Sequence, residues 1–300
     1  MQLKRLNKQI RAHASHLGEN ATGISYLTIY RFTDNIIEMP QADLPYIYFV
    51  TDGSMRLHTP SGIMDYVAGQ YSVSAIDTPD SGRVLTFSEE SDFVALSIRF
   101  SLDDVISVVL DMDGDLAERI LSSDLSSRLQ SGSDQRIIDV ILRLLDIADE
   151  PEQLAFMGKH LKREIIFNIL CGSCGKQFLQ STINIQQAGE IYEINSWIKQ
   201  NYKESFTIEE LAERRHMSVS NFHQKFKSAV GMGPLQCQKR LRLTEARRLM
   251  LDENVSVTDA AIEVGYESVS QFIRDYRKMF NSSPKEDIQN LKKQFKAQPI

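Results

Sequence analysis

Two stretches in the last third of the chain place hydrogen-bonding side chains opposite a seam of aromatic residues. Phe222 and Phe226 form the first seam, and Phe272 and Tyr276 form the second. Amide side chains suit adenine edges, a guanidinium can bind O6 and N7 of guanine together, and lysine attracts phosphate. Side chains of these kinds, suited to reading duplex DNA, project away from both seams: Ser220, His223, Gln224, Lys227, Ser270, Gln271, Arg274 and Lys278.

Capping chemistry predicts the helices that must position these side chains. A serine or threonine oxygen at a helix start accepts backbone N–H groups that no helical carbonyl can reach, and an acidic or amide residue three positions later strengthens the signal. The pattern predicts a short helix, a turn and a longer helix in each stretch, over about 207–230 and 256–280. The four expected caps are Thr207, Ser218, Ser256 and Ser268.

A connecting helix is expected between the two units. Gly233-Pro234 marks its start, because proline is tolerated at the first helical position, and the helix continues to about Leu251. Roughly 17 residues at ~1.5 Å each give a strut of about 25 Å. Such a strut can hold the two longer helices about one duplex turn, ~34 Å, apart, so that they enter successive major grooves on one face.

This part of the chain resembles the DNA-binding domain of AraC/XylS-type transcription regulators. The resemblance implies a sequence-specific regulator with double-stranded operator DNA and RNA polymerase as partners. Gln224 stands where arginine is common in that family, so contact with base or phosphate is expected to differ there. The residues that carry the resemblance are Met217–Lys227, Gly231–Leu235, Leu241–Leu243, Glu245–Arg247, Val264–Tyr266, Ser270–Phe272, Arg274 and Ser283–Pro284.

Composition and charge set limits on the class of protein. The chain has 300 residues, 42% of them hydrophobic, which favours two domains. The net charge of −6 is unevenly divided: residues 1–184 hold 16 Lys+Arg against 25 Asp+Glu, and the remainder holds 18 against 15. The basic surplus therefore lies in the segment expected to bind DNA. No membrane span or signal peptide is visible, and three cysteines fit a reducing cytoplasm, so we expect a cytoplasmic, nucleoid-associated protein.

The front of the chain predicts a β-domain. Leu3, Leu6 and Ile10 indicate an amphipathic first helix ending near Gly18, and short apolar runs with Gly and Pro turns follow to Phe100. Residues 18–24, 27–32 and 69–71 resemble the cupin-like sensory barrel of one class of AraC-type N-terminal domain. The expected fold is therefore α+β with two domains: a cupin-like barrel over about 20–100 with helices over 101–172, and an all-α domain of two helix-turn-helix units.

A small organic effector is expected inside the barrel. Tyr30, Tyr48, His58 and Tyr71 combine apolar bulk with a hydrogen-bonding tip, as the walls of ligand pockets do. A cupin-type oxygenase or isomerase is an alternative, but its metal would need a cluster of histidines and a carboxylate, and His58 is the only histidine of the strand region. We therefore expect no enzyme activity, no metal and no cofactor.

The segment after Phe100 predicts helices that either complete the core or pair with a second subunit. Two apolar stripes, over 135–148 and 152–170, lead us to expect a homodimer, although stripes alone do not identify what they face. Residues 173–187 lack a strong period and are the candidate linker, so the domains are expected at 1–180 and 181–300. Helical hairpins also serve as protein-interaction modules, a third and less favoured function.

Cys171 and Cys174 have the spacing of a thioredoxin-type dithiol. They follow a predicted helix rather than a strand, and no second Cys or His pair lies nearby to complete a zinc site. Structural cysteines are the simplest interpretation. A regulator that senses thiols or electrophiles through these two residues is the alternative.

Overall fold

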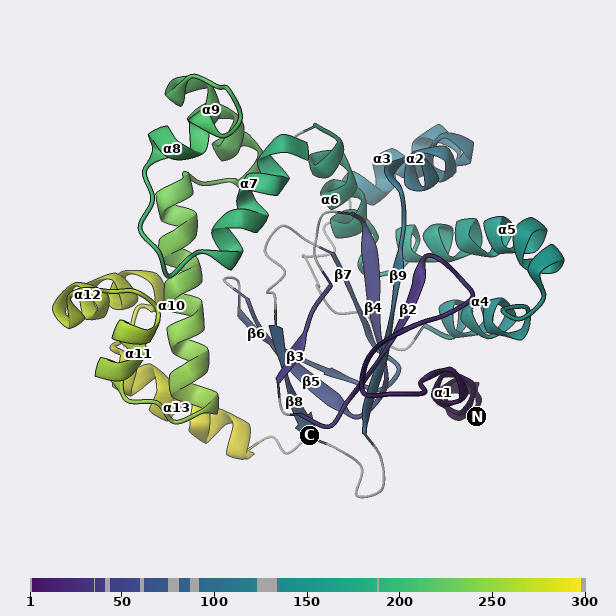
Figure 1. Cartoon of the computed structure of the whole chain (residues 1–300), viewed down its shortest axis with the longest axis horizontal. Helices are drawn as coiled ribbons and strands as arrows, with labels where there is room; N and C mark the ends of the chain where they lie inside the picture. Colours follow the sequence, from purple (N-terminus) through teal and green to yellow (C-terminus); the bar gives the residue numbers. More distant parts are fainter. Residues whose placement is uncertain are drawn as a thin grey trace. The chain divides into compact units, whose positions relative to one another are not determined.

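The chain forms two compact units. The computed structural model describes residues 2–34, 36–40, 44–59, 62–74, 81–86, 92–122, 134–187 and 189–297. The first unit comprises Met1–Leu57 and Ile63–Gly189, and the second comprises His58–Gly62 and Glu190–Ile300. The first holds two β-sheets with helices, and the second is helical (Figure 1). This confirms the α+β class, and the division falls at Gly189 where the sequence predicted residue 180.

Two antiparallel sheets make the centre of the first unit. The five-stranded sheet has the order β1-β2-β9-β4-β7, and the four-stranded sheet has the order β3-β8-β5-β6. The strands are β1 (Gly18–Ala21), β2 (Leu27–Phe32), β3 (Ile36–Glu38), β4 (Tyr46–Asp52), β5 (Ser54–Thr59), β6 (Gly62–Val67), β7 (Tyr71–Val73), β8 (Ser81–Thr86) and β9 (Phe93–Arg99).

Strict alternation along these strands separates two apolar cores. On β4, Tyr46, Tyr48 and Val50 join the core between the sheets, whereas Ile47 and Phe49 join the core beneath the helices. Because both faces of the strand are covered, its sequence is a continuous apolar run rather than a polar and apolar alternation. The five-stranded sheet is therefore the layer that both cores share.

The helices of the first unit form one layer on the outer face of this sheet. They contribute Ile10, Ile141, Ile165 and Phe178 to the core that also contains Leu96 of β9. Helices α1, α4 and α5 lie over the sheet in Figure 1. Their bounds are α1 (Gln2–His13), α2 (Leu102–Asp111), α3 (Gly114–Ser122), α4 (Gln135–Asp146), α5 (Pro151–Leu170) and α6 (Gly175–Gln187).

Most of the candidate linker, residues 175–187, forms helix α6, and the whole segment belongs to the first unit. Phe178 is fully buried and meets Phe100 edge-on, with 5.7 Å between ring centroids, and Cys174 is buried beside it. The segment carries few apolar residues and so shows little periodicity in sequence. Tertiary burial, rather than propensity, supplies most of the stability of such a helix.

The first helix also ends earlier than predicted, at His13, and β1 begins at Gly18. Asn20 organises the turn between them: its side chain donates to the carbonyls of His16 and Gly18 and accepts from the His16 backbone N–H. Within the predicted strand region, residues 75–80 and 87–91 lie outside the described residues.

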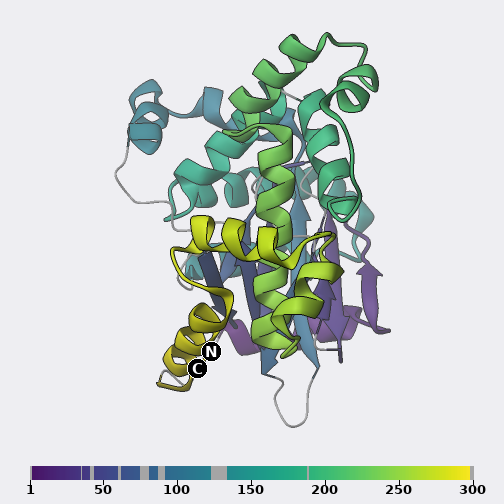
Figure 2. The same cartoon turned by 90° about the vertical axis from the view of Figure 1, so that its left-hand side faces the viewer.

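The second unit consists of helices arranged along one long helix, α10. In Figure 2 the α8–α9 pair lies toward one end of α10, and the α11–α12 pair lies toward the other. The helices are α7 (Gly189–Gln200), α8 (Ile208–Glu213), α9 (Val219–Val230), α10 (Pro234–Asp252), α11 (Val257–Glu263), α12 (Val269–Phe280) and α13 (Pro284–Ala297). Across the described part of the chain, no helix combines the length and apolar character that a membrane crossing requires.

Candidate nucleic-acid interface

Side-chain caps begin the helices of both helix-turn-helix units, as predicted. Thr207 and Glu210 form a reciprocal capping box: the Glu210 N–H donates to Thr207 Oγ1 at 3.2 Å, and the Thr207 N–H donates to Glu210 Oε2 at 2.8 Å. Ser218, Ser256 and Ser268 each accept from a backbone N–H three residues later. The bonds to Ser218 and Ser268 fix where α9 and α12 start, the longer helices predicted to recognise DNA and called recognition helices below, and therefore which of their side chains lie on the outer face.

Gly265 makes possible the turn between α11 and α12, in the second helix-turn-helix unit. Its φ is +86°, and a Cβ at this position would lie 2.3 Å from the Lys203 carbonyl oxygen. A side chain would therefore be strained by the backbone conformation and would also clash with a neighbouring segment. The first helix-turn-helix unit also has a residue in the left-handed conformation in its turn, His216, with a φ of 50°.

Arg242 of α10 contacts segments next to both helix-turn-helix units. Its guanidinium donates to the carbonyls of Tyr202 (2.6 Å), Lys203 (2.9 Å) and Glu204 (3.1 Å), which follow α7, and to the carbonyl of Gly265 (2.7 Å). Desolvation lowers the pKa of this guanidinium. A single side chain thus satisfies backbone acceptors in the segment before the first helix-turn-helix unit and in the turn of the second helix-turn-helix unit.

A second network anchors α12 to the end of α10. Arg247 forms two bonds to Asp287, at 2.8 and 2.9 Å, and the Tyr276 hydroxyl donates to the same carboxylate at 2.7 Å. Burial raises the pKa of Tyr276, and the neighbouring Asp287 carboxylate raises it further. The phenol therefore stays protonated and remains a hydrogen-bond donor. Asp287 belongs to α13, a helix that the sequence analysis missed although Ser283 caps it and Pro284 is its first residue.

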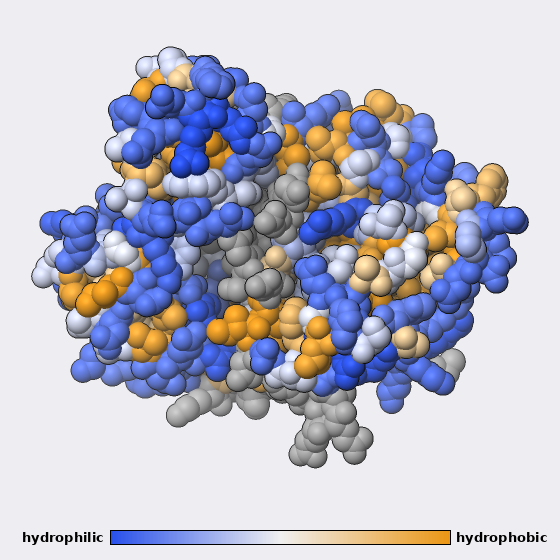
Figure 3. All heavy atoms as spheres, in the orientation of Figure 1, coloured by the Kyte–Doolittle hydropathy of each residue, from blue (hydrophilic) through white to orange (hydrophobic). Residues whose placement is uncertain are grey.

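The predicted recognition side chains are exposed on the outer faces of α9 and α12. Phe222, Phe226, Phe272 and Tyr276 are fully buried, and no hydrogen bond or ion pair within the described ranges occupies the side chains of Gln224 or Arg274. The outer surface of α8 and α9 is mostly hydrophilic in Figure 3. The exposed set comprises Ser220, Gln224, Lys227, Ser270, Gln271, Arg274 and Lys278, together with His223 on the flank of α9.

His223 is exposed and lies at the edge of the face that carries Ser220, Gln224 and Lys227, about 60° from Ser220 and about 40° from Lys227 on the helix wheel. Its Nε2 would be 3.0 Å from a Cβ on Gly233, so the ring lies against the start of α10. Its position on the helix wheel is about 100° from Gln224, next to the buried side. The imidazole is therefore placed to support the turn between α9 and α10.

Arg277 is a further candidate that the sequence analysis missed. The two recognition helices repeat with an offset of 50 residues, so that Phe222 matches Phe272 and Lys227 matches Arg277. Arg277 is exposed and forms no ion pair with any residue that the structure describes. The repeat itself contained this signal, because Arg277 occupies the place at which Lys227 was already predicted to meet phosphate.

Arg274 is available for a ligand because its neighbour is committed elsewhere. Asp275, the acid that could have paired with it, lies 3.1 Å from Lys239 of α10. Within the described ranges Arg274 forms no ion pair. An exposed guanidinium without a carboxylate partner can present its planar fork to a base or a phosphate.

The four predicted effector residues do not share one face. Tyr30 and Tyr48 lie in the core between the sheets, with 5.3 Å between ring centroids. Tyr71 instead packs on Phe49 in the core beneath the helices. His58 follows the inward-facing Leu57 on β5 and so points to the opposite face. The expectation that Tyr71 and His58 line the barrel interior is wrong, because side chains alternate along a strand.

Neither Cys171 nor Cys174 forms a disulfide in the described structure, and neither has the environment of a reactive thiol. Burial raises the pKa of Cys174 to about 11 and also raises that of Cys171, which Arg136 partly offsets. A redox-sensing thiol normally has a lowered pKa. Within the described residues, no group of three or more His, Cys, Asp or Glu side chains could hold a metal ion.

Two helix-turn-helix units on one connecting helix, with exposed cationic and amide side chains on both recognition helices, define a DNA-binding protein. Residues 211–290 match the model of a helix-turn-helix domain, and residues 23–177 match that of the AraC-type transcriptional regulator N-terminus. The second match covers more than half of the chain. The chain therefore belongs to the AraC-type family of transcriptional regulators and is not an enzyme.

Similar proteins include the HTH-type transcriptional activator RhaS of Yersinia pestis bv. Antiqua (strain Angola), 31% identical over 110 residues. That alignment covers 37% of this chain and 40% of the relative. ToxT of Vibrio cholerae strain SCE256, solved with an unsaturated fatty acid, is 14% identical over 87% of this chain and 94% of its own, with a TM-score of 0.46. A probable AraC family regulator of Rhodopseudomonas palustris CGA009 is 31% identical over 34% of this chain and 95% of its own, with a TM-score of 0.31.

Replacing Gly265 with alanine is expected to destabilise the second helix-turn-helix unit by more than ~1 kcal/mol. The positive φ disfavours any side chain, and the new Cβ would clash with the Lys203 carbonyl. Chemical denaturation of the full chain measures the change. Gly189→Ala is the matched control, since a Cβ there meets nothing within 4 Å and its φ is not positive. Equal stability of the two variants would contradict this account of the turn.

Replacing Arg274 with alanine is expected to cost ~1–3 kcal/mol in operator affinity and to relax specificity at one base pair, as for loss of a bidentate base contact. Binding to a library of single-base operator variants measures both effects. Arg277→Ala is the comparison, with a uniform loss across sequences and a smaller salt dependence, as for a phosphate contact. A uniform loss for Arg274→Ala would reassign that side chain to phosphate.

Proposed function

We propose that this regulator binds its operator through both recognition helices and that a small organic effector, held between the two sheets of the first unit, controls that binding. The observation that carries the proposal is the placement of Tyr30 and Tyr48. Both are buried on the inner face of the five-stranded sheet, in a unit distinct from the DNA-binding helices. Phenol groups in an enclosed core combine apolar surface with directed hydrogen bonding, as ligand sites require.

In this proposal Gln224 and Arg274 read bases, because they occupy matching central positions of α9 and α12. Lys227, Arg277 and Lys278 contribute phosphate attraction, which depends on salt but not on sequence. The exposed hydroxyl and amide groups of Ser220, Ser270 and Gln271 are placed for further base or phosphate contacts. His223 borders the same exposed face and is placed for a contact with DNA, while its ring also lies against the start of α10.

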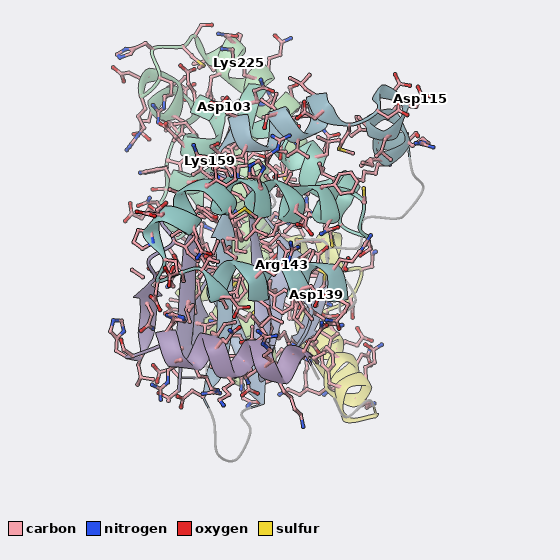
Figure 4. All side chains as sticks on the ribbon, turned by 90° about the vertical axis from the view of Figure 1, so that its right-hand side faces the viewer. Asp103, Asp115, Asp139, Arg143, Lys159 and Lys225 are labelled. Carbon is pink, nitrogen blue, oxygen red and sulfur yellow. The ribbon has the colours of Figure 1, made fainter. Side chains whose placement is uncertain are left out.

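We also propose a homodimer that forms through α5. Three large apolar side chains of this helix remain exposed: Phe156 at 69%, Met157 at 41% and Phe167 at 42%. Charged side chains also occur on these helices, among them Lys159 on α5 and Arg143 on the neighbouring α4, both labelled in Figure 4. Exposed apolar side chains interspersed with charges of both signs are suited to a self-complementary contact.

The remaining parts of the proposal concern the cellular setting. A regulator bound at an operator acts by changing access or recruitment of RNA polymerase, which we propose as its protein partner. Because its DNA target lies in the nucleoid and Cys171, Cys174 and Cys237 form no disulfide in the described structure, we place it in the cytoplasm. Sensing through Cys171 and Cys174 is not favoured, since burial raises the pKa of both thiols.

Operator binding by the full-length chain is expected to change when its effector is added, whereas the fragment from Gln186 onward should bind DNA without responding. A ligand can shift an equilibrium between two states only by its difference in affinity for them, so the response requires the unit that binds it. Electrophoretic or fluorescence binding assays with matched fragments test this. A response retained by the isolated fragment would falsify effector control from the first unit.

Replacing Phe156 and Phe167 with serine is expected to shift the full chain from dimer to monomer in sedimentation velocity. Each buried phenylalanine contributes ~1.5–3 kcal/mol of apolar burial, so the dimerisation constant should weaken by at least ten-fold. The control is Leu110→Ser on α2, another exposed apolar residue, at 77%. A double variant that dimerises as tightly as the parent would exclude α5 as the interface.

A further inference from the structure

The inner face of the five-stranded sheet carries a row of polar side chains inside an apolar core. Ser72 of β7 lies opposite Tyr48 of β4, and Tyr48 lies opposite Ser97 of β9. Ser72 is 4% exposed and the other two are fully buried. Side chains directly opposite each other have Cβ atoms ~4.5–5.5 Å apart, so the three hydroxyl-bearing side chains are neighbours across β7, β4 and β9 (Figure 1).

Arg99 extends this row at the end of β9. It lies opposite Tyr46 and two residues beyond Ser97, which places it on the same face. The charge of Arg99 affects the neighbouring Tyr30: burial raises the pKa of Tyr30, and Arg99 is among the groups that oppose this rise. The polar row therefore ends in a cation.

Three donors of this row have no partner. Tyr48 Oη, Ser72 Oγ and Arg99 Nε are inaccessible to solvent and form no hydrogen bond within the part of the chain that the structure describes. The adjacent Tyr30 differs, because its hydroxyl lies 3.2 Å from Ser97 Oγ. Buried donors in native proteins are nearly always paired, with protein, water or a ligand.

Arg99 also lacks a counter-charge, unlike other arginines of the same unit. Arg56 lies 2.6 Å from Asp65, and Arg11 lies 2.7 Å from Asp52, but no carboxylate of the described ranges pairs with Arg99. Glu19 shares the face, opposite Tyr30 on the edge strand β1, and is exposed. It lies two strands and four residues away, roughly 16 Å by strand geometry. Arg99 is half-buried with its Nε shielded from solvent, and a cation in this setting without a counter-charge is suited to an anionic partner.

We propose that Arg99, Tyr48 and Ser72 bind the anionic head of a small organic acid. All three side chains can donate to a carboxylate, and a guanidinium does so with charge-assisted bonds. The apolar body of the acid lies against Val50, Met55, Leu57 and Phe93 in the core between the sheets. The inference rests on the proposed effector control, to which it adds the chemical class of the effector.

The first test needs no ligand, because a site built for an anion costs stability when empty. In thermal unfolding of the dialysed full chain, Tyr48→Phe and Arg99→Met should each raise Tm by about 2–4 °C, since each removes an unpaired buried donor. Tyr30→Phe is the matched control and should lower Tm, because it leaves Ser97 without its partner. Lower Tm for both Tyr48→Phe and Arg99→Met would overturn the proposal.

The second test uses four defined probes: octanoate, 4-phenylbutyrate and their neutral amides. The acids should raise Tm of the parent chain in a saturable way while the amides do not, and Arg99→Met should weaken acid binding about ten- to a hundred-fold. Absence of any acid response, equal response to the amides, or full acid binding by Arg99→Met would overturn the assignment. Operator binding that responds to the amides alone would preserve effector control and overturn only the acid class.

Discussion

The architecture of the DNA-binding unit depends on one half-buried arginine that donates to backbone carbonyls from two parts of the unit. The carbonyls that follow a helix have no intrahelical donor, and three of them after α7 converge on Arg242. The same guanidinium donates to Gly265, in the turn of the other helix-turn-helix unit. No lysine could replace it, because only a planar fork supplies several donors in fixed directions. The two units are thus aligned by one side chain on the helix that connects them.

Local chemistry made the DNA-binding unit predictable from the sequence. The caps at Thr207, Ser218, Ser256 and Ser268 and the proline at position 234 depend only on residues close in the chain, and all are confirmed. Helix α13 has the same kind of signal in Ser283-Pro284, a serine cap followed by a proline at the first helical position. Arg277 can be predicted from the 50-residue repeat, whereas the aromatic seam alone does not single it out.

The errors in the first unit have a different physical origin. Helix α6 has weak periodicity, and its stability comes from Phe178 packing on Phe100, a contact between residues distant in sequence. Tyr71 and His58 have the chemistry of pocket residues, but their orientation is set by strand register, which a single strand does not reveal. The polar row of Ser72, Tyr48 and Ser97 likewise exists only after three strands have been paired. Side-chain type was therefore predictable, whereas the face it occupies was not.

The difference between the two recognition helices gives a single bound chain a direction along DNA. Gln224 is at the centre of one helix, and Arg274 is at the centre of the other, with Arg277 and Lys278 beside it. A chain with two unlike units in fixed order recognises a non-palindromic element, so reversing that element turns the whole protein around. The orientation of the operator therefore decides which surface of the protein faces the start of transcription.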